Sequence, residues 1–265
     1  MFRVSGMLLV IDVGNTEVTL GLFDRDQLTH HWRLTTGTRR TPDEWAMILT
    51  SYLSHAGHST QEVAASISAS VAPAVTECVA AGVGLAVGHR PVQIVPSMEL
   101  PVELDVDEPM QVGADRIVNT IAAVGLYQRD TVVVDFGTAT TFDCITADGR
   151  FIGGVIAPGL EVAANELSQR AAKLPATELV PPAKVIGRRT EECIRSGVLF
   201  GTADAVDGIV RRIKREWPGD TVPYVVATGG LAEKIVSLSQ EIDATEPHLT
   251  LLGLKLTAEH LGLGW

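Results

Sequence analysis

The sequence has few of the residues that would point to a disulfide-stabilised, zinc-binding or membrane protein. Only 3 of its 265 residues are cysteines, and Cys78, Cys144 and Cys193 lie far apart without paired spacing. This pattern suits a reducing compartment and excludes a zinc knuckle. No apolar run approaches the roughly 18 residues of a membrane span, and the start of the chain does not resemble a secretory signal. We therefore expect a cytoplasmic protein with no membrane partner. Since Met7 precedes the first expected strand, residues 1–6 are interpreted as a dispensable extension.

Basic residues are also too few for a general nucleic-acid binder. The chain has 21 Lys and Arg against 32 Asp and Glu, which gives a formal net charge of −11. An acidic surface repels phosphate backbones, so we expect no nucleic-acid partner. The apolar fraction of 46% and the charged fraction of 20% are typical of a globular protein. The chain is long enough for one large domain or for two of about 130 residues each.

Residues suited to phosphate chemistry gather at a turn near the N-terminus. Apolar runs at 7–11 and 18–23 predict two antiparallel strands, and between them lie Asp12, Gly14, Asn15 and Thr16. Glycine lets a ligand approach the backbone, Asn and Thr supply neutral donors, and an aspartate at a strand end can hold a divalent cation against a phosphate. Taken alone, this match is more often an ordinary hairpin turn than a site.

The same pattern recurs near the middle of the chain. An apolar run at 131–134 is followed by Asp135, Gly137, Thr138, Thr140 and Thr141, and then by a second strand-like stretch. Two strand-turn-strand units of this kind predict a duplicated α/β fold that holds a ligand between its halves. We place the halves at residues 1–112 and 113–265, because the segment 96–112 is rich in proline and acid and resembles a connection.

Other patterns predict the elements between these turns. Thr41 and Pro42 form a helix start, and the run Gly82 to Gly88 is interpreted as a loop, since its glycine spacing and position do not fit a dinucleotide-binding turn. Helical spacing over 249–261 predicts a C-terminal helix packed on the second half. Further strands are expected at 28–34, 64–71, 92–95, 151–157 and 224–228, and further helices at 73–81, 117–127, 160–173 and 187–212.

Two more sites draw attention by their position. Asp115, in the run Gly113-Ala114-Asp115-Arg116, lies at a predicted helix N-terminus, where the helix dipole favours an acid. A capping role and a catalytic role are equally compatible with that spacing. Gly229 and Gly230 end a predicted strand, a context in which the backbone can lie flat against a nucleotide.

Taken together, six ordered motifs resemble those of type III pantothenate kinase, a family of the actin, sugar kinase and Hsp70 superfamily. They are Asp12 to Thr16, Gly113 to Arg116, Asp135 to Thr141, Gly153 to Gly159, Gly187 to Thr190 with Ser196-Gly197, and Thr228 to Gly230. The resemblance extends from Met7 to Gly253. It implies a duplicated ribonuclease H-like (actin-like ATPase) fold of two similar domains with a cleft between them.

The resemblance also implies an activity and its partners. The family phosphorylates pantothenate at its primary hydroxyl with ATP, giving 4'-phosphopantothenate in the first step of coenzyme A biosynthesis. It implies a divalent cation such as Mg²⁺, a monovalent cation such as K⁺ or NH₄⁺, and a homodimer whose pantothenate pocket lies at the subunit interface.

Carried over by position, the motifs assign roles to individual residues. Asp115 is similar to the general base, Arg116 and Gly113 to groups of the substrate pocket, and Thr190 to a residue that reaches the pocket from the partner subunit. Asp12 resembles the ligand of the divalent cation, and Asp135 that of the monovalent cation. The phosphate and nucleotide contacts fall on Asp12, Gly14, Asn15, Thr16, Gly137, Thr138, Thr140, Thr141, Gly229 and Gly230.

The sequence departs from the family pattern near the expected substrate pocket. Val106 and Glu108 stand where the family often has Tyr and Asn, and Arg189 stands where it often has Asn. These changes leave the phosphate loops intact and bear on the substrate. Two alternatives therefore stand beside the leading hypothesis: a kinase of the same fold that acts on another small hydroxy acid, and a catalytically silent nucleotide-binding regulator. The second alternative predicts loss of Asp12 or Asp115, and both residues are present.

Overall fold

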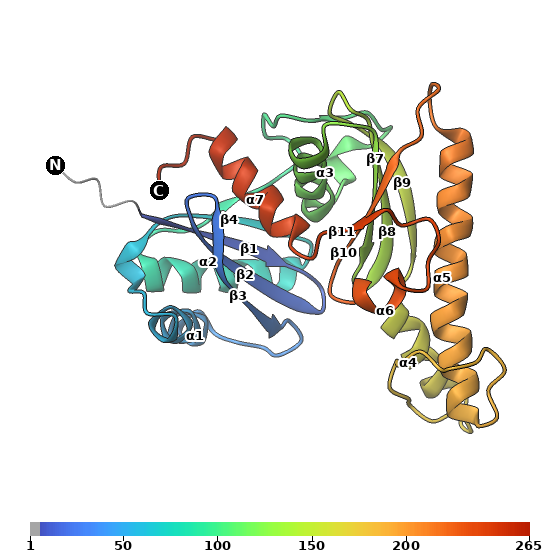
Figure 1. Ribbon diagram of the computed structural model, residues 1–265. Coiled ribbons are helices and arrows are strands. Elements are labelled where there is room, and N and C mark those ends of the chain that lie inside the picture. Colours follow the sequence, from blue (N-terminus) through green and yellow to red (C-terminus); the bar gives the residue numbers. More distant parts are fainter. Residues whose placement is uncertain (1–5) are drawn as a thin grey trace. The chain divides into compact units, whose positions relative to one another are not determined.

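The computed structural model describes residues 6–265, so of the predicted extension only Gly6 lies within the described chain. The chain forms two compact units (Figure 1). Unit 1 comprises Met1–Gly125 and Thr250–Trp265, and unit 2 comprises Leu126–Leu249. The division differs from the predicted boundary between residues 112 and 113, because the helix that follows the boundary packs on the core of unit 1.

Unit 1 is a mixed sheet with helices, and its strands run in the order β3-β2-β1-β4-β5. β1 pairs antiparallel with β2 and parallel with β4, which confirms the predicted hairpin around Asp12. The elements are β1 (Met7–Val13), β2 (Glu17–Asp24), β3 (Gln27–Thr35), α1 (Pro42–His55), η1 (Thr60–Glu62), β4 (Val63–Ser70), α2 (Pro73–Val87), β5 (Val92–Gln93), β6 (Glu103–Leu104), η2 (Pro109–Gln111), α3 (Ala114–Tyr127) and α7 (Leu249–His260).

The two helices after the first hairpin begin as the sequence predicts. Thr41 caps α1 in a reciprocal capping box with Glu44, which satisfies backbone N–H groups that the helix leaves unpaired. The predicted loop at Gly82 to Gly88 is wrong, because α2 continues to Val87 and ends at Gly88 with φ +85°. A Cβ on Gly82 would lie 2.3 Å from the Cβ of Trp45, so this glycine allows α1 and α2 to pack closely.

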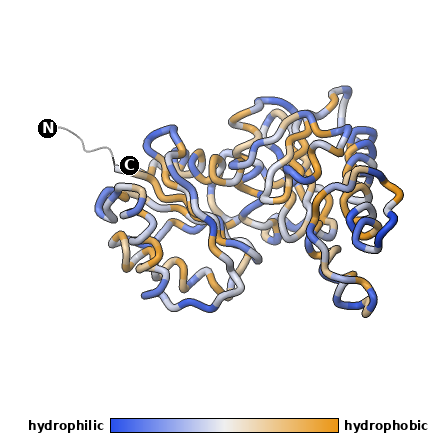
Figure 2. Tube along the Cα trace, turned by 60° about the horizontal axis from the view of Figure 1, so that its bottom comes forward, coloured by the Kyte–Doolittle hydropathy of each residue, from blue (hydrophilic) through white to orange (hydrophobic). Residues whose placement is uncertain are grey.

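One face of the unit 1 sheet is covered by α3 and α7. Hydrophobic stretches, in orange, alternate with hydrophilic ones along the chain (Figure 2). Ile117 and Ile121 of α3 share a buried cluster with Leu8 and Val10 of β1 and with Leu254 of α7. The prediction that the C-terminal helix packs on the second half is therefore wrong.

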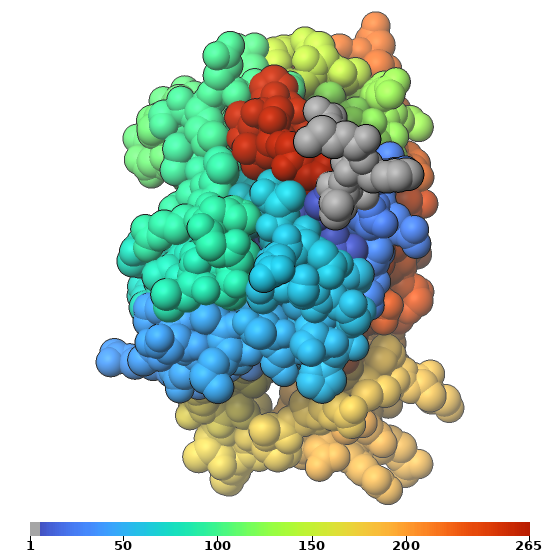
Figure 3. Space-filling view, turned by 90° about the vertical axis from the view of Figure 1, so that its left-hand side faces the viewer, coloured from blue at the N-terminus to red at the C-terminus, as the bar shows by residue number. Residues whose placement is uncertain are grey.

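Contacts beyond this cluster also attach α7 to unit 1. The Thr250 hydroxyl donates to Oδ1 of Asn119 over 2.8 Å, and Lys255 forms ion pairs with Asp26 and Glu259. In Figure 3 the C-terminal segment, in red, lies against the blue-green segments of unit 1. Helical periodicity alone could not choose between the two units, since an apolar stripe indicates burial but not the surface that buries it.

Unit 2 repeats the hairpin pattern of unit 1. Its strands run in the order β11-β10-β7-β8-β9, with β7 antiparallel to β8 and parallel to β10. The helix-covered face of this sheet packs on α5, whose buried residues include Val198, Leu199 and Val206. The elements are β7 (Thr131–Phe136), β8 (Ala139–Ile145), β9 (Arg150–Pro158), α4 (Leu160–Arg170), α5 (Thr190–Glu216), β10 (Tyr224–Thr228), α6 (Ala232–Val236) and β11 (Ala244–Thr245).

Candidate functional site

The first predicted phosphate turn lies between β1 and β2 and is held by backbone contacts. The Gly14 N–H donates to the Glu17 carbonyl over 2.9 Å, and the Thr36 hydroxyl donates to the Gly14 carbonyl over 2.8 Å. The Thr36 N–H also donates to the Thr16 carbonyl over 2.8 Å. These bonds fix the backbone while the side chains of Asn15 and Thr16 stay exposed. The turn is thus preorganised and presents polar groups to solvent.

Gly14 and Asp12 fit the predicted roles of this turn. A Cβ on Gly14 would lie 2.9 Å from the Glu17 carbonyl oxygen, so the tight turn excludes a side chain there. Asp12 is half-buried one residue before the end of β1, opposite Thr19 of β2 and Ala69 of β4. Its carboxylate therefore belongs to the carboxyl edge of the two parallel strands, where open α/β sheets bind their ligands.

Asp115 lies at the same edge of unit 1. It is in the first turn of α3, and a Cβ built on Gly113 would lie 2.4 Å from Oδ1 of Asp115 and 3.3 Å from a methyl carbon of Val71. Val71 follows β4, and its N–H donates to the carbonyl of Val13 at the end of β1 over 3.0 Å. The chain of contacts Asp115, Gly113, Val71 and Val13 brings the predicted base to the strand ends that carry Asp12.

The environment of Asp115 changes its acidity. Burial raises the pKa of the Asp115 carboxyl, since it disfavours the charged form. The backbone N–H of Arg116, which donates to Oδ1 over 2.8 Å, and the Arg116 guanidinium oppose that rise without cancelling it. Asp115 is therefore a stronger base than an ordinary aspartate, as a group that accepts a proton from a hydroxyl should be.

The second predicted phosphate turn lies between β7 and β8 of unit 2. The Gly137 N–H donates to the Ala139 carbonyl over 3.0 Å, as the Gly14 N–H does to Glu17 in unit 1. A Cβ on Gly159, the residue before α4, would lie 2.2 Å from the Thr138 carbonyl oxygen. The N-terminus of α4 therefore supports the turn from behind, and Thr138 remains exposed.

The predicted nucleotide turn lies beside this second turn. Thr228 of β10 pairs with Asp135 of β7, and the Leu231 N–H donates to the Phe136 carbonyl over 3.2 Å. Gly229 has φ +93°, and a Cβ there would lie 2.4 Å from Oδ1 of Asp135. Only glycine fits that left-handed conformation and that close approach without strain. The structure thus brings Asp135, Gly137 and Gly229 together within unit 2.

The threonines of β8 divide between the two faces of the sheet. Successive side chains alternate along a strand, so Thr141 shares a face with Asp135, whereas Thr140 faces the helix-covered side with Phe142. Thr140 is 2% exposed and lines a hollow of about 1060 Å³ between β8, α4 and α5. The structure therefore separates Thr140 from the exposed polar groups of the turn, where the motif groups them.

The predicted substrate residues lie in both units. Val106 is half-buried in the segment between β6 and η2 of unit 1. Thr190 is the first residue of α5, and with Lys173 and Arg189 it lines a hollow of about 580 Å³ in unit 2.

Among residues 6–265, no group of three or more His, Cys, Asp or Glu side chains is arranged to hold a metal ion. In the same range, no helix is long and apolar enough to cross a bilayer.

A family model described as type III pantothenate kinase matches residues 8–212. The chain belongs to the type III pantothenate kinase family. It is 42% identical over 253 residues to the type III pantothenate kinase of Moorella thermoacetica, covering 96% of this chain and 99% of the relative. It is 43% identical over 259 residues to that of Streptomyces coelicolor, covering 96% and 98%. The six motifs of the sequence thus identified the family correctly.

Solved structures show the fold of this family member. An activator of 2-hydroxyisocaproyl-CoA dehydratase from Clostridium difficile, solved with bound ADPNP, has a TM-score of 0.59 at 12% identity and covers 97% of this chain and 96% of its own. ROK hexokinase from Thermus thermophilus has a TM-score of 0.52 at 13% identity and covers 96% and 99%. These are proteins of the actin-like ATPase and sugar kinase fold, and the duplicated ribonuclease H-like prediction is confirmed.

Sequence reasoning missed Thr36, and it named Gly159 as part of a motif without predicting which turn of this pantothenate kinase family member it supports. Thr36 holds Gly14 from across the sheet, 22 positions later in the chain, and no local spacing signals that contact. Gly159 supports Thr138 from the start of α4. Its place after a proline and before a helical run was visible in the sequence, but that position alone does not reveal which turn it touches.

Proposed function

We propose that Asp115 is the general base of this chain, with the ATP phosphates bound by the turn at Asp12 to Thr16 and by Gly137, Thr138 and Thr141 of the second turn. Membership of the family makes the chain an enzyme, a pantothenate kinase of coenzyme A biosynthesis that uses ATP and a divalent cation. The single observation that supports the base is the contact chain from Asp115 through Gly113 and Val71 to the ends of β1 and β4. It supports the proposal because a carboxyl group of raised pKa then lies at the strand ends beside the first turn.

The proton step follows from that placement. Phosphoryl transfer depends mainly on positioning and on neutralising oxygen charge, so the base has little covalent work to do. The Asp115 carboxylate accepts the hydrogen bond of the primary hydroxyl of pantothenate, orients its oxygen toward the γ-phosphorus, and takes the proton as the oxygen–phosphorus bond forms. ADP leaves with the electron pair of the broken bond. Arg116 and Gly113 are proposed to form the part of the substrate pocket next to this hydroxyl, with Val106 lining it farther along.

The proposed divalent cation fits a site with one protein carboxylate. Mg²⁺ is usually held by one or two carboxylates, several waters and substrate phosphates, so the lack of a three-residue cluster among the described residues is compatible with Asp12 as ligand. When bound, the cation neutralises charge on the phosphate oxygens. The net charge of −11 increases the need for such neutralisation.

Asp135 is the proposed ligand of the monovalent cation, K⁺ or NH₄⁺. Its Oδ1 lies 2.4 Å from the position of a Cβ on Gly229 and 3.8 Å from that of a Cβ on Gly137, so the carboxylate is close to both glycine turns of unit 2. Gly229 and Gly230 are proposed to pack on the adenosine, because neither residue has a side chain that would hold a nucleotide away from the backbone. We further propose that the enzyme acts in the cytoplasm, without nucleic-acid or membrane partners.

A homodimer completes the proposal. Thr190 is proposed to reach the pantothenate pocket of a second copy from the start of α5. The adjoining groove between α4 and α5 is mainly apolar, and the exposed side chains of Val162 and Leu167 stand on α4 beside it. An apolar surface of this kind favours protein association. Light scattering combined with activity measurements tests this point, because a fully active monomer would refute a pocket shared between subunits.

The deciding experiment is a coupled assay of ADP release with and without pantothenate, at varied K⁺ and NH₄⁺. We expect release to depend on pantothenate and to rise with one of the two ions. The changes at Val106, Glu108 and Arg189 favour one competitor, a kinase for another small hydroxy acid. A panel of hydroxy acids distinguishes it, because an active panel member with unreactive pantothenate would contradict our assignment. Nucleotide binding without any turnover would instead support the regulator.

A further inference from the structure

Asp207 is a buried carboxylate for which neither the proposed reaction nor the sequence motifs assign a use. It lies in the middle of α5 and is 4% exposed. An aspartate is rarely buried to this extent unless its oxygens accept hydrogen bonds, because removing a charge from water is costly. Its partners therefore indicate what the structure uses it for.

Within residues 6–265, the hydrogen bonds to the Asp207 carboxylate come from one short segment of the chain. Oδ1 accepts from the Ser239 hydroxyl over 2.5 Å, from the Gln240 N–H over 3.1 Å and from the Glu241 N–H over 3.2 Å. Oδ2 accepts from the Gln240 N–H over 3.0 Å. A single carboxylate thus binds three successive residues of the segment 237–243, which joins α6 to β11.

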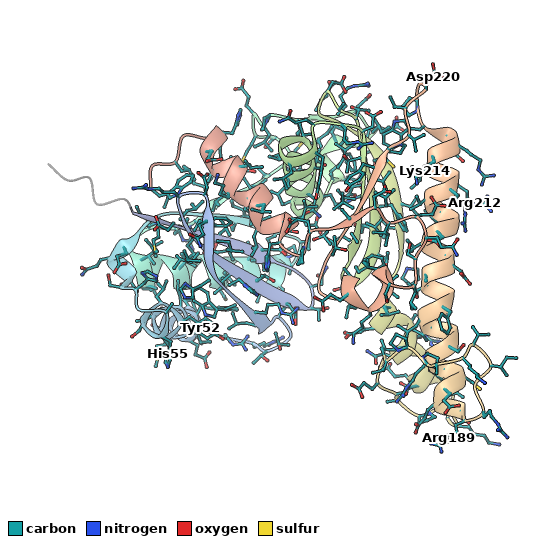
Figure 4. All side chains as sticks on the ribbon, in the orientation of Figure 1. Tyr52, His55, Arg189, Arg212, Lys214 and Asp220 are labelled. Atoms are coloured by element: carbon teal, nitrogen blue, oxygen red, sulfur yellow. The ribbon has the colours of Figure 1, made fainter. Side chains whose placement is uncertain are left out.

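Two basic residues on the same stripe of α5 continue this attachment. Lys214 Nζ donates to Glu241 over 2.8 Å, and Arg211 lies 3.5 Å from the same carboxylate. Asp207, Arg211 and Lys214 are spaced i, i+4 and i+7, so they lie along one side of the helix. Figure 4 shows Lys214 and Arg212 on opposite sides of α5, as their spacing requires. One side of α5 therefore clamps the segment 237–243.

The clamped segment is connected at both ends to the proposed nucleotide turn. At its start, α6 begins at Ala232, separated by one residue from the pair Gly229 and Gly230, and the Ser239 N–H still donates to the Ile235 carbonyl at the end of α6. At its end, the Asp243 N–H donates to the Val225 carbonyl of β10 over 2.9 Å, and β10 leads into Gly229. A shift of the segment 237–243 would therefore move both β10, which leads into the turn, and α6, which comes after it.

We propose that Asp207 is a positioning residue for ATP, which acts by holding the segment 237–243 and thereby the turn at Gly229 and Gly230. This inference rests on the proposed placement of the adenosine on that turn. In this proposal Asp207 contacts neither substrate. It affects the nucleotide through the position of α6 and of the turn that precedes α6. It should therefore change the affinity for ATP and leave the affinity for pantothenate unaltered.

The test compares Asp207→Asn with Asp204→Asn in the full-length enzyme. Asp204 is an exposed residue one turn earlier on α5 and serves as the matched control. Asparagine keeps the shape of the side chain but loses the charge that strengthens the bonds to the N–H groups. We expect Asp207→Asn to raise the KM and the Kd for ATP about tenfold, to change the KM for pantothenate less than twofold, and to speed amide exchange in residues 229–242. Asp204→Asn should match the parent in all of these.

A milder variant provides the test if Asp207→Asn fails to fold. Ser239→Ala removes one of the bonds to Asp207 and should raise the KM for ATP in the same direction by a smaller factor, so it decides the question if Asp207→Asn does not accumulate. A lower Tm with an unchanged Kd for ATP in both variants would show a structural role only and overturn the proposal.

A second comparison separates this inference from the proposed function. Gly229→Ala introduces a clash in the turn itself. If Gly229→Ala weakens ATP binding and Asp207→Asn does not, the positioning role alone is wrong. If Gly229→Ala leaves the Kd for ATP unchanged, the placement of the adenosine is wrong and the inference fails with it.

Discussion

The missing side chain of Gly113 leaves the space that Oδ1 of Asp115 occupies, since a Cβ at residue 113 would lie 2.4 Å from that oxygen. The glycine is thus required by the position of the carboxylate, because its own φ lies outside the left-handed region. The pair explains why a glycine and an aspartate occur two positions apart at the start of α3. It also separates two ways of disabling the base, by displacing it and by neutralising it.

Gly113→Ala should displace the Asp115 carboxylate, since the added methyl group and the oxygen cannot both occupy the site. A small misplacement of a reacting group costs about 100-fold in rate, so we expect kcat to fall by that order while the Kd for ATP stays near the parent value. Gly37→Ala is the control, because a Cβ at Gly37 meets no atom within 4 Å. Steady-state kinetics with an unchanged kcat in Gly113→Ala would argue against a positioned base.

Asp115→Asn should keep ATP binding and lose about 100- to 10,000-fold in kcat, the range of general base catalysis. Because burial raises the pKa of Asp115, the parent should lose activity as the pH falls through that raised pKa. The residual activity of Asp115→Asn should lack this acidic limb. A pH profile of kcat/KM checks both, and near-normal turnover of the variant would eliminate the role.

The raised pKa of Asp115 also predicts how stability depends on pH. The charged form, which catalysis requires, is the form that stabilises the fold less. A carboxyl whose pKa is higher in the folded than in the unfolded state stabilises the fold when protonated, and that stabilisation is lost as the pH rises through the folded pKa. At neutral pH the charged Asp115 is therefore a cost, and Asp115→Asn should be at least as stable as the parent. Urea unfolding at pH 7 measures this, and marked destabilisation of the variant would contradict the burial argument.

Asp26 and Lys255 should give the opposite dependence on pH. The hydrogen bond and charge of Lys255 lower the pKa of Asp26, so the pair stabilises the fold above the ordinary pKa of an aspartate and stops doing so as the pH falls through the depressed value. Asp26→Asn should therefore lower the urea midpoint at pH 7, and the difference from the parent should disappear in acid. Asp24→Asn, on the same hairpin tip, is the control.

Two glycines in the middle of helices should respond in opposite directions to alanine. A Cβ on Gly253 of α7 would lie 2.0 Å from the Val118 carbonyl oxygen of α3, so Gly253→Ala should destabilise unit 1 by about 1–3 kcal/mol through overpacking. A Cβ on Gly208 of α5 meets nothing within 4 Å, and Gly208→Ala should add about 0.4–1 kcal/mol. Equal effects in urea unfolding would mean that α7 is not packed on α3 as described.

Sequence alone determined the features that depend on neighbours along the chain. The alternation of apolar residues identified the hairpins around Asp12 and Asp135, and the capping residues identified the start of α1. The order of the six motifs identified the family, since each motif is local and their sequence order survives without knowledge of the fold. Pattern arguments work for such features because the repeat of a strand or a helix is itself local.

Only the tertiary structure decided which surfaces those elements meet. It showed that α7 packs on unit 1 and that the glycines after Ala81 belong to a helix and its packing surface, not to a loop. It also showed that Thr140 and Thr141 lie on opposite faces of their strand. It also revealed the hydrogen bond from Thr36 to the Gly14 carbonyl and those from the segment 237–243 to Asp207. These contacts join residues far apart in the chain, and their energy comes from burial and hydrogen bonding that no local spacing encodes.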